Sequence, residues 1–178
     1  MGASLKTEIK SLAGEQQQYL TFVIGGEIFA IGILHVKEII EYGNLTEVPM
    51  MPNCIRGVIN LRGAVVPVVD LSARFGKNPT ELGKRTCIVI CEIEVDGERQ
   101  DVGAIVDAVN EVLDISATEI ESAPAFGAKI RTDFISGMGK VKGKFIILLN
   151  VNNVLSVNEL CMLAQSGVNG QMAVASAG

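Results

Sequence analysis

The chain has 178 residues, and 48% of them are hydrophobic, enough to bury the core of one domain or of two small domains without metals or disulfides. Its 15 Lys and Arg are scattered among 20 Asp and Glu, for a net charge of −5, so no basic patch for a nucleic acid is expected. Aromatic residues make up only 4% and Trp is absent, which also argues against base-stacking platforms.

The same composition favours a cytosolic protein. No apolar run approaches the roughly 20 residues that span a membrane, and the N-terminal segment has no apolar signal core. The cysteines, with no CxxC spacing, are Cys54, Cys87, Cys91 and Cys161, and His35 is the only histidine. Buried free thiols are therefore favoured over a metal site.

The first elements in chain order are a hairpin and a helical segment. YLTFVIGGEIFAI predicts two short strands that turn at Gly25-Gly26. The following ILHVKEIIEY predicts a short helix or helical turn, because four apolar residues recur at helical spacing: Ile33, Val36, Ile39 and Ile40.

A loop and a second hairpin follow. TEVPMMPNCIRG contains two prolines and predicts a loop, whose Met50 and Met51 suit either an interaction surface or a cap on the core. GVINL and AVVPVVDL predict two strands around an Arg62-Gly63 turn. Because Pro67 cannot donate to a ladder, we expect its strand to be an edge strand or to carry a bulge.

Arg62 raises the main functional question. Gly63 can adopt the positive φ that a tight turn needs, which places Arg62 at the exposed tip. Two explanations remain open from the residues alone: the guanidinium is simply solvated, or it is presented to a partner.

The second half predicts two more hairpins, which turn at Asp96-Gly97 and at Lys142-Gly143. Ser156 and Glu159 form a capping-box pattern that predicts a short C-terminal helix through Leu163. Many short strands at roughly ten-residue spacing indicate an all-β barrel or sandwich.

An internal repeat supports this architecture. Residues 57–71 align without gaps on residues 137–151, an offset of 80. The alignment pairs Arg62 with Lys142 and Asp70 with Asn150. Two degenerate copies of one small β unit explain it, with chance similarity between apolar strands as the alternative.

Catalytic patterns are scarce in this sequence. It contains neither GxxxxGK[ST] nor GxSxG, and the carboxylates between Glu92 and Asp101 suggest a solvated hairpin face. We therefore expect a binding protein without cofactor or metal. A hydrolase built on His35 stays open as a distant alternative.

Four stretches occur in the order typical of one family: YLTFVIGGEIFAIGILHVKEII, VPMMPNCIRGVINLRGAVVPVVDLSARFG, VGAIVDAVNEVLDI and FISGMGKVKGKFIILLNV. Over roughly residues 18–163 the chain resembles the CheW family, the adaptors of bacterial chemotaxis. The arrangement P-x-x-I-R-G-V-I-N-L-R-G is the most specific part. Asn150 departs from the pattern, because aspartate is frequent there.

The resemblance implies a mainly β fold of two small five-stranded SH3-like barrels that share a hydrophobic interface, with short helices including one at the C-terminus. It implies one domain over 18–163, with subdomains 18–84 and 85–163 that are either consecutive or interlocked. Residues 1–17 and 164–178 are expected to be flexible tails.

The resemblance also implies a non-enzymatic coupler. CheW-like proteins bind the cytoplasmic tip of methyl-accepting chemoreceptors and the regulatory domain of the histidine kinase CheA, in arrays associated with the membrane. The chain is too short for CheA itself and lacks the receiver domain of CheV. An adaptor for pilus motility or surface sensing is the alternative.

Site residues are carried over position by position. The receptor-binding set implied by the resemblance is Val36, Glu38, Gly57, Asn60, Leu61, Arg62 and Gly63. The kinase-binding set is Ile39, Glu41 and Val48. A partner that recognises Arg62 is the explanation that this resemblance favours.

Overall fold

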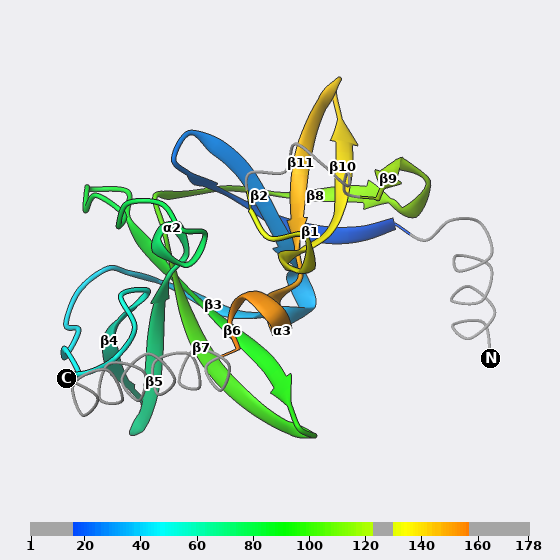
Figure 1. The fold of residues 1–178 in the computed structure, drawn as a ribbon. Helices are drawn as coiled ribbons and strands as arrows, with labels where there is room; N and C mark the ends of the chain where they lie inside the picture. Colours follow the sequence, from blue (N-terminus) through cyan, green and yellow to red (C-terminus); the bar gives the residue numbers. More distant parts are fainter. Residues whose placement is uncertain (1–15, 123–129, 157–178) are drawn as a thin grey trace, which may run out of the picture.

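Short strands joined by two-residue turns make up most of the computed structural model, which describes residues 16–122 and 130–156. They form two sheets, one in the upper half of Figure 1 and the other mostly in the lower half. The first sheet has the order β8-β1-β2-β11-β10-β9, with strands β1 (Gln16–Ile24), β2 (Glu27–Gly32), β8 (Ala108–Ser116), β9 (Ile120–Glu121), β10 (Ile135–Val141) and β11 (Lys144–Leu149). The second has the order β3-β6-β7-β5-β4, with strands β3 (Val36–Glu41), β4 (Ile55–Leu61), β5 (Ala64–Asp70), β6 (Cys87–Val95) and β7 (Glu98–Val106).

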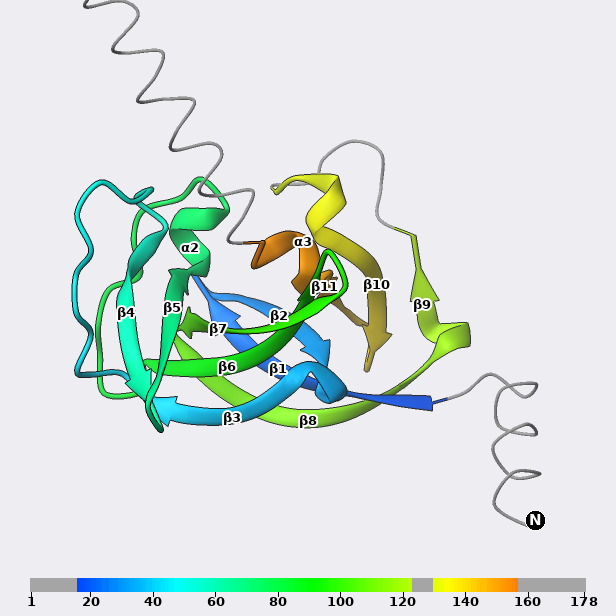
Figure 2. The same ribbon diagram turned by 90° about the horizontal axis from the view of Figure 1, so that it is seen from below.

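The two sheets share one design. In each, two antiparallel hairpins are joined by a parallel pairing of their second strands, β2 with β11 and β7 with β5 (Figure 2). In the described part of the chain, short helical segments lie between the strands or follow the last one: η1 (Ile33–His35), α2 (Leu71–Arg74), η2 (Ala117–Glu119), η3 (Thr132–Phe134) and α3 (Val151–Val154).

Sheet membership does not follow the order of the chain. Residues 16–32 pair with strands from 108–149, while residues 36–106 supply the second sheet. The subdomain boundary expected after residue 84 falls between β5 and β6, inside the second sheet. As a division into domains it stays a prediction. Strand β1 begins two residues inside the tail expected at 1–17.

Strand β6 shows how the core is built. Ile88 and Ile90 point to one side, into a cluster enclosed by the second sheet, while Val89 and Cys91 point to the other side, into a cluster shared by both sheets. The alternation follows from the two-residue period of a strand. A third cluster, with Ile146 and Leu148 of β11, lies within the first sheet.

These clusters confirm the expected mainly β fold with two small barrel-like units and a shared hydrophobic interface. One detail differs from the expectation. The first sheet has six strands instead of five, because the two-residue strand β9 pairs with β10.

Aromatic and cationic side chains tie the two halves together. Arg74 of α2 donates from Nε to the carbonyl of Val154 (2.9 Å) and from Nη2 to that of Asn153 (3.2 Å). Its guanidinium carbon also lies 4.6 Å from the centre of the Phe134 ring. Because these carbonyls belong to the last turn of α3, Arg74 satisfies acceptors that a helix end leaves unpaired.

The expected helix over ILHVKEIIEY is wrong except for one turn. Only the 3-10 segment η1 is helical, and Val36–Glu41 forms strand β3. Burial alternates along β3, and its backbone pairs with β6, for example at Ile39 with Val89. Pairing with a distant strand therefore outweighed a weak local periodicity.

The expectation that Pro67 lies on an edge strand or at a bulge is wrong, because the register shift between β4 and β5 falls between Ile55 and Gly57, opposite Val69 and Val68. Strand β5 is not an edge strand, because β4 and β7 flank it. The parallel pairing with β7 starts at Val68, however, so Pro67 is paired on one side only, with Val58.

The expected C-terminal helix and the 164–178 tail lie outside the described residues.

Two of the cysteines confirm the expectation of buried free thiols. Cys54 and Cys91 are buried and Cys87 is half-buried, none of them in a disulfide. Burial raises the pKa of the Cys91 thiol to about 12, so it is protonated and unreactive at neutral pH. Cys161 lies outside the described residues.

Candidate functional site

The tip of the β4–β5 hairpin is a tight turn built on two left-handed residues. Arg62 has φ 53° and Gly63 has φ 86°, the pattern of a type I′ turn. Only Gly63 was expected to adopt a positive φ. Asn60 compensates for the strained arginine, because its Oδ1 accepts a hydrogen bond from the Gly63 amide at 2.9 Å.

The guanidinium of Arg62 reaches from this tip to strand β3. Its Nη2 lies 3.0 Å from Oε2 of Glu38, and the side chains are 78% and 24% exposed. A pair this exposed contributes at most about 1 kcal/mol to folding. Since a guanidinium carries five N–H donors, most of them still face solvent. The tip thus presents a cation that is oriented but not buried.

Gly57 supports the tip from below. A Cβ atom at this position would collide with the carbonyl oxygen of Thr46. That carbonyl accepts a hydrogen bond from the Val58 amide (2.8 Å), and the Thr46 amide donates to the Val58 carbonyl (2.9 Å). Gly57 therefore allows the segment before β4 to pack against it, which is a structural role.

The remaining members of the expected receptor-binding set lie on the same two strands. Val36 on β3 packs against the shared core, and Leu61 at the end of β4 packs against the core of the second sheet. The structure thus brings Glu38 and Arg62 into direct contact and joins Asn60 to Gly63, while Val36, Leu61 and Gly57 contribute mainly to packing.

The residues expected to face the kinase lie on the other side of β3. Glu38 and Ile40 point toward the hairpin and the core, whereas Ile39 and Glu41 are exposed on the opposite face. Val48 is exposed in the loop between β3 and β4. Glu38 therefore lies on one face of this edge strand, and Ile39 and Glu41 lie on the other. Val36, which precedes the register shift and pairs with Cys91, is on the same face as Ile39.

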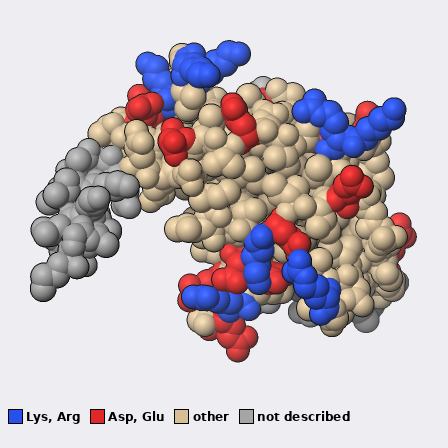
Figure 3. All heavy atoms as spheres, turned by 180° about the vertical axis from the view of Figure 1, so that it is seen from behind, with Lys and Arg blue, Asp and Glu red and all other residues tan. Residues whose placement is uncertain are grey.

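Lys37 was missed by the sequence analysis. It is exposed at the register shift between Val36 and Glu38, and its Nζ lies 3.1 Å from Asp101 and 3.4 Å from Glu92. The hydrogen bond to Asp101 raises the pKa of Lys37. Figure 3 shows acidic and basic side chains intermixed at the lower end of the molecule, around the β6–β7 hairpin. Nothing in the spacing of Lys37 marks this contact, because its partners are about sixty residues away.

A buried ion pair anchors the base of the hairpin. Asp70 is fully buried, and its Oδ2 accepts from Arg56 Nε (3.0 Å) and from the Thr80 amide (2.8 Å). Its Oδ1 accepts from the Ser72 amide at 3.0 Å, which caps helix α2. Asp70 thus binds strand β4, helix α2 and the following loop to one carboxylate.

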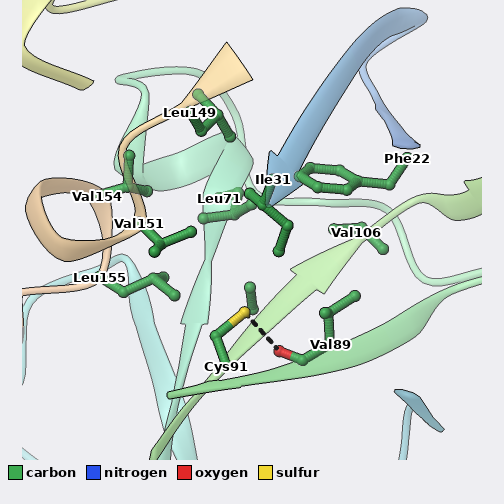
Figure 4. Close-up of a pocket in the computed structure, with 11 residues that line it drawn as sticks. Phe22, Ile31, Leu71, Val89, Cys91, Val106, Leu149, Val151, Val154 and Leu155 are labelled. Atoms are coloured by element: carbon green, nitrogen blue, oxygen red, sulfur yellow. Dashed lines mark hydrogen bonds between the residues drawn. The ribbon is translucent and has the colours of Figure 1, made fainter. Parts of the chain in front are cut away.

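A small cavity lies in the shared core of the described residues. It is apolar, has a volume of about 10 Å³ and is lined by side chains such as Phe22, Leu71, Cys91 and Leu155 (Figure 4). That volume barely admits one water molecule, and an apolar lining gives water no partners. It is a packing gap.

Neither metal chemistry nor membrane insertion is indicated in the described parts of the chain. Within residues 16–122 and 130–156, no cluster of three or more His, Cys, Asp or Glu is placed to hold a metal ion. None of the helices described there is long and apolar enough to cross a membrane.

A two-sheet β module with an exposed, oriented arginine at a hairpin tip defines a class of small β-barrel binding proteins. Comparisons with known proteins narrow this class to a family. A family model described as a CheW-like domain matches residues 18–159, so the chain belongs to the CheW family, a family of chemotaxis scaffold proteins.

Individual CheW proteins are also similar to this chain over most of its length. The chemotaxis protein CheW of Klebsiella aerogenes is 34% identical over 157 residues, which cover 87% of this chain and 92% of that protein. The chemotaxis protein CheW of Bacillus subtilis is 36% identical over 152 residues, 85% and 92% of the two chains. The crystal structure of the scaffolding protein TtCheW from Thermoanaerobacter tengcongensis matches with a TM-score of 0.71 and 34% identity, over 78% of this chain and 87% of that one.

Proposed function

We propose that this protein couples methyl-accepting chemoreceptors to the histidine kinase CheA on the cytoplasmic side of membrane-associated chemosensory arrays, and that it does so as an adaptor without catalytic activity. The observation that carries the proposal is the family match over 18–159 together with a hairpin tip that holds Arg62 exposed and oriented.

The receptor surface is proposed to be the Arg62 tip and the adjoining face of β3. Arg62 is already oriented by Glu38, so a receptor carbonyl or carboxylate can bind its remaining donors at little cost in side-chain entropy. Asn60 and Gly63 fix the turn, and Gly57 and Val36 fix the strands below it.

The kinase surface is proposed to be the opposite side of β3 with the loop that follows. Ile39 and Val48 are exposed apolar residues there, and Glu41 adds a charge. An arrangement on two faces of one strand lets both partners bind at once, which a coupler requires. Several weak contacts of this kind gain strength by avidity in an array.

The test is isothermal titration of the full chain with a soluble receptor-tip hairpin and, separately, with the isolated regulatory domain of CheA. Arg62→Ala is expected to weaken receptor binding about thirtyfold, for a loss of about 2 kcal/mol, and to leave kinase binding unchanged. Ile39→Ala is expected to show the reverse pattern.

The internal repeat supplies a matched control. Lys142 occupies the position of Arg62 in the second repeat, so Lys142→Ala removes a cation from the same kind of turn. It is expected to leave both affinities unchanged. Equal losses for the two variants would contradict a specific role for Arg62, and no binding of either partner to the wild type would favour an adaptor of another chemosensory pathway.

A further inference from the structure

The second repeat carries a hairpin tip with the same backbone as the Arg62 tip. Lys142 has φ 51° and Gly143 has φ 77°, and this turn joins β10 to β11 as the Arg62-Gly63 turn joins β4 to β5. In Figure 1 it is the uppermost point of the molecule, and in Figure 3 a group of basic side chains lies there.

Three lysines give this tip its charge. Lys140, Lys142 and Lys144 are all exposed, and none of them forms an ion pair with any part of the chain that the structure describes. The Arg62 tip differs, because the guanidinium of Arg62 forms an ion pair with Glu38 of β3.

Strand pairing explains why the second tip lacks such a carboxylate. Glu38 on β3 pairs with Ile90, six residues before the β6–β7 turn at Asp96. In the first sheet, the residue six positions before the β1–β2 turn is Tyr19, and it pairs with Leu113 of β8. A leucine that packs against the core thus stands where the other sheet has Glu38.

An exposed aromatic ring lies on the same face of the hairpin as Lys140, whereas Lys144 pairs with Val141 on the other face. Phe145 is 53% exposed and is the cross-strand partner of Lys140, so the two side chains emerge on the same face of the hairpin. In the first repeat this position is held by Val65, which is also exposed.

We propose that the β10–β11 tip is a further binding site, which takes an acidic segment of a partner protein in which an apolar side chain is flanked by carboxylates. The carboxylates bind the lysines, as Glu38 binds Arg62 within the first repeat, and the apolar side chain covers Phe145. A nucleic acid fits less well, because the chain carries a net charge of −5 and the tip offers one ring and three cations. This site is separate from the proposed receptor and kinase surfaces.

The test uses nuclear magnetic resonance of the full, isotope-labelled chain with the end-blocked peptide Glu-Glu-Leu-Glu-Glu as the probe. Amide shifts are expected at residues 140–145 and not around Arg62. Replacing Lys140, Lys142 and Lys144 together by Gln is expected to weaken binding about tenfold, and Phe145→Ala several-fold. Arg62→Ala removes a cation from the other tip, and it is expected to leave the affinity for this peptide and the shifts at residues 140–145 unchanged.

Two control peptides separate charge from apolar contact. Gln-Gln-Leu-Gln-Gln and Glu-Glu-Ser-Glu-Glu are each expected to bind more weakly, and added salt is expected to weaken the acidic peptide further. Absence of shifts at 140–145, or equal shifts with the Gln peptide, would overturn the proposal. So would shifts that depend on protein concentration without peptide, because they would identify a second copy of the chain as the occupant. If the triple variant fails to fold, the salt titration of the wild type with the acidic peptide still tests whether charge contributes to binding.

Discussion

The unit β4–β5–α2 and the unit β10–β11–α3 have nearly the same backbone and different chemistry. In both, a register shift occurs at a glycine, the turn has two positive φ values, and a polar residue at the end of the second strand caps a short helix. These residues are Gly57, Asp70 and, 80 positions later, Gly137 and Asn150.

The polar side chains on this shared backbone diverge. Asp70 is charged and pairs with Arg56, whereas Asn150 is neutral, and the counterpart of Arg56 is Ser136, whose hydroxyl donates to the Leu148 carbonyl at 3.2 Å. At the tips, Arg62 is compensated by a carboxylate and Lys142 is not. The comparison teaches that glycines, caps and apolar alternation reproduce the unit, while the polar positions are free to acquire separate functions.

The two units are expected to differ most in how much unfolding free energy is lost when the residue that caps the helix is replaced. Asp70→Ala removes a buried carboxylate and leaves Arg56 without its partner, so it is expected to cost about 4 kcal/mol of unfolding free energy. Asn150→Ala loses only a helix cap and is expected to cost about 1 kcal/mol. Urea unfolding of both variants checks this order, and equal costs would mean that the ion pair adds nothing beyond capping.

The second largest difference is expected in the stability cost of replacing the glycine at the register shift of each unit. A methyl group at Gly57 meets the backbone carbonyl of Thr46, which two hydrogen bonds hold in place, so Gly57→Ala is expected to cost about 3 kcal/mol. At Gly137 the nearest atoms are Cγ2 of Ile120 and, at 3.2 Å, the backbone oxygen of Glu121. Both belong to strand β9, which pairs with β10 over only two residues and can shift, so Gly137→Ala is expected to cost about 1 kcal/mol. Thermal unfolding of the two variants is the measurement. A larger loss at Gly137 would show that the second unit is the more tightly packed.

The smallest change in unfolding free energy is expected when the cation at either hairpin tip is replaced. Arg62→Ala is expected to lower the unfolding free energy by less than about 1 kcal/mol, because its pair with Glu38 is largely exposed. Lys142→Ala, with no ion pair in the described residues, is expected to leave stability unchanged. A double-mutant cycle of Arg62 and Glu38 isolates the pair. Coupling well above 1 kcal/mol would make Arg62 a structural residue and weaken its assignment to a partner.

Local signals in the sequence were sufficient for much of the fold. The four hairpins turn at the glycines where they were expected, and the gapless alignment of residues 57–71 on 137–151 corresponds to two units of the same structure. These features depend on short-range chemistry, namely positive φ at glycine and alternation along a strand. The exposed position of Arg62 followed from the same turn.

The predictions that were wrong or missing concern contacts between strands that are far apart in the sequence. Ile39 and Ile40 suggested a helix, yet the edge of the second sheet made this segment a strand. The ion pair of Arg56 with Asp70 and the contacts of Lys37 join residues whose separation carries no periodic signal.

The sequence by itself determined the hairpins, the repeat, the family and the residue at the tip, because each depends on neighbours within a few positions or on a motif read along the chain. Only the tertiary structure decided which strands share a sheet, that Glu38 pairs with Arg62, and that the lysines of the other tip form no ion pair with the described residues. The physical reason is that these outcomes depend on the register between strands far apart in the chain, which burial of the shared core selects as a whole.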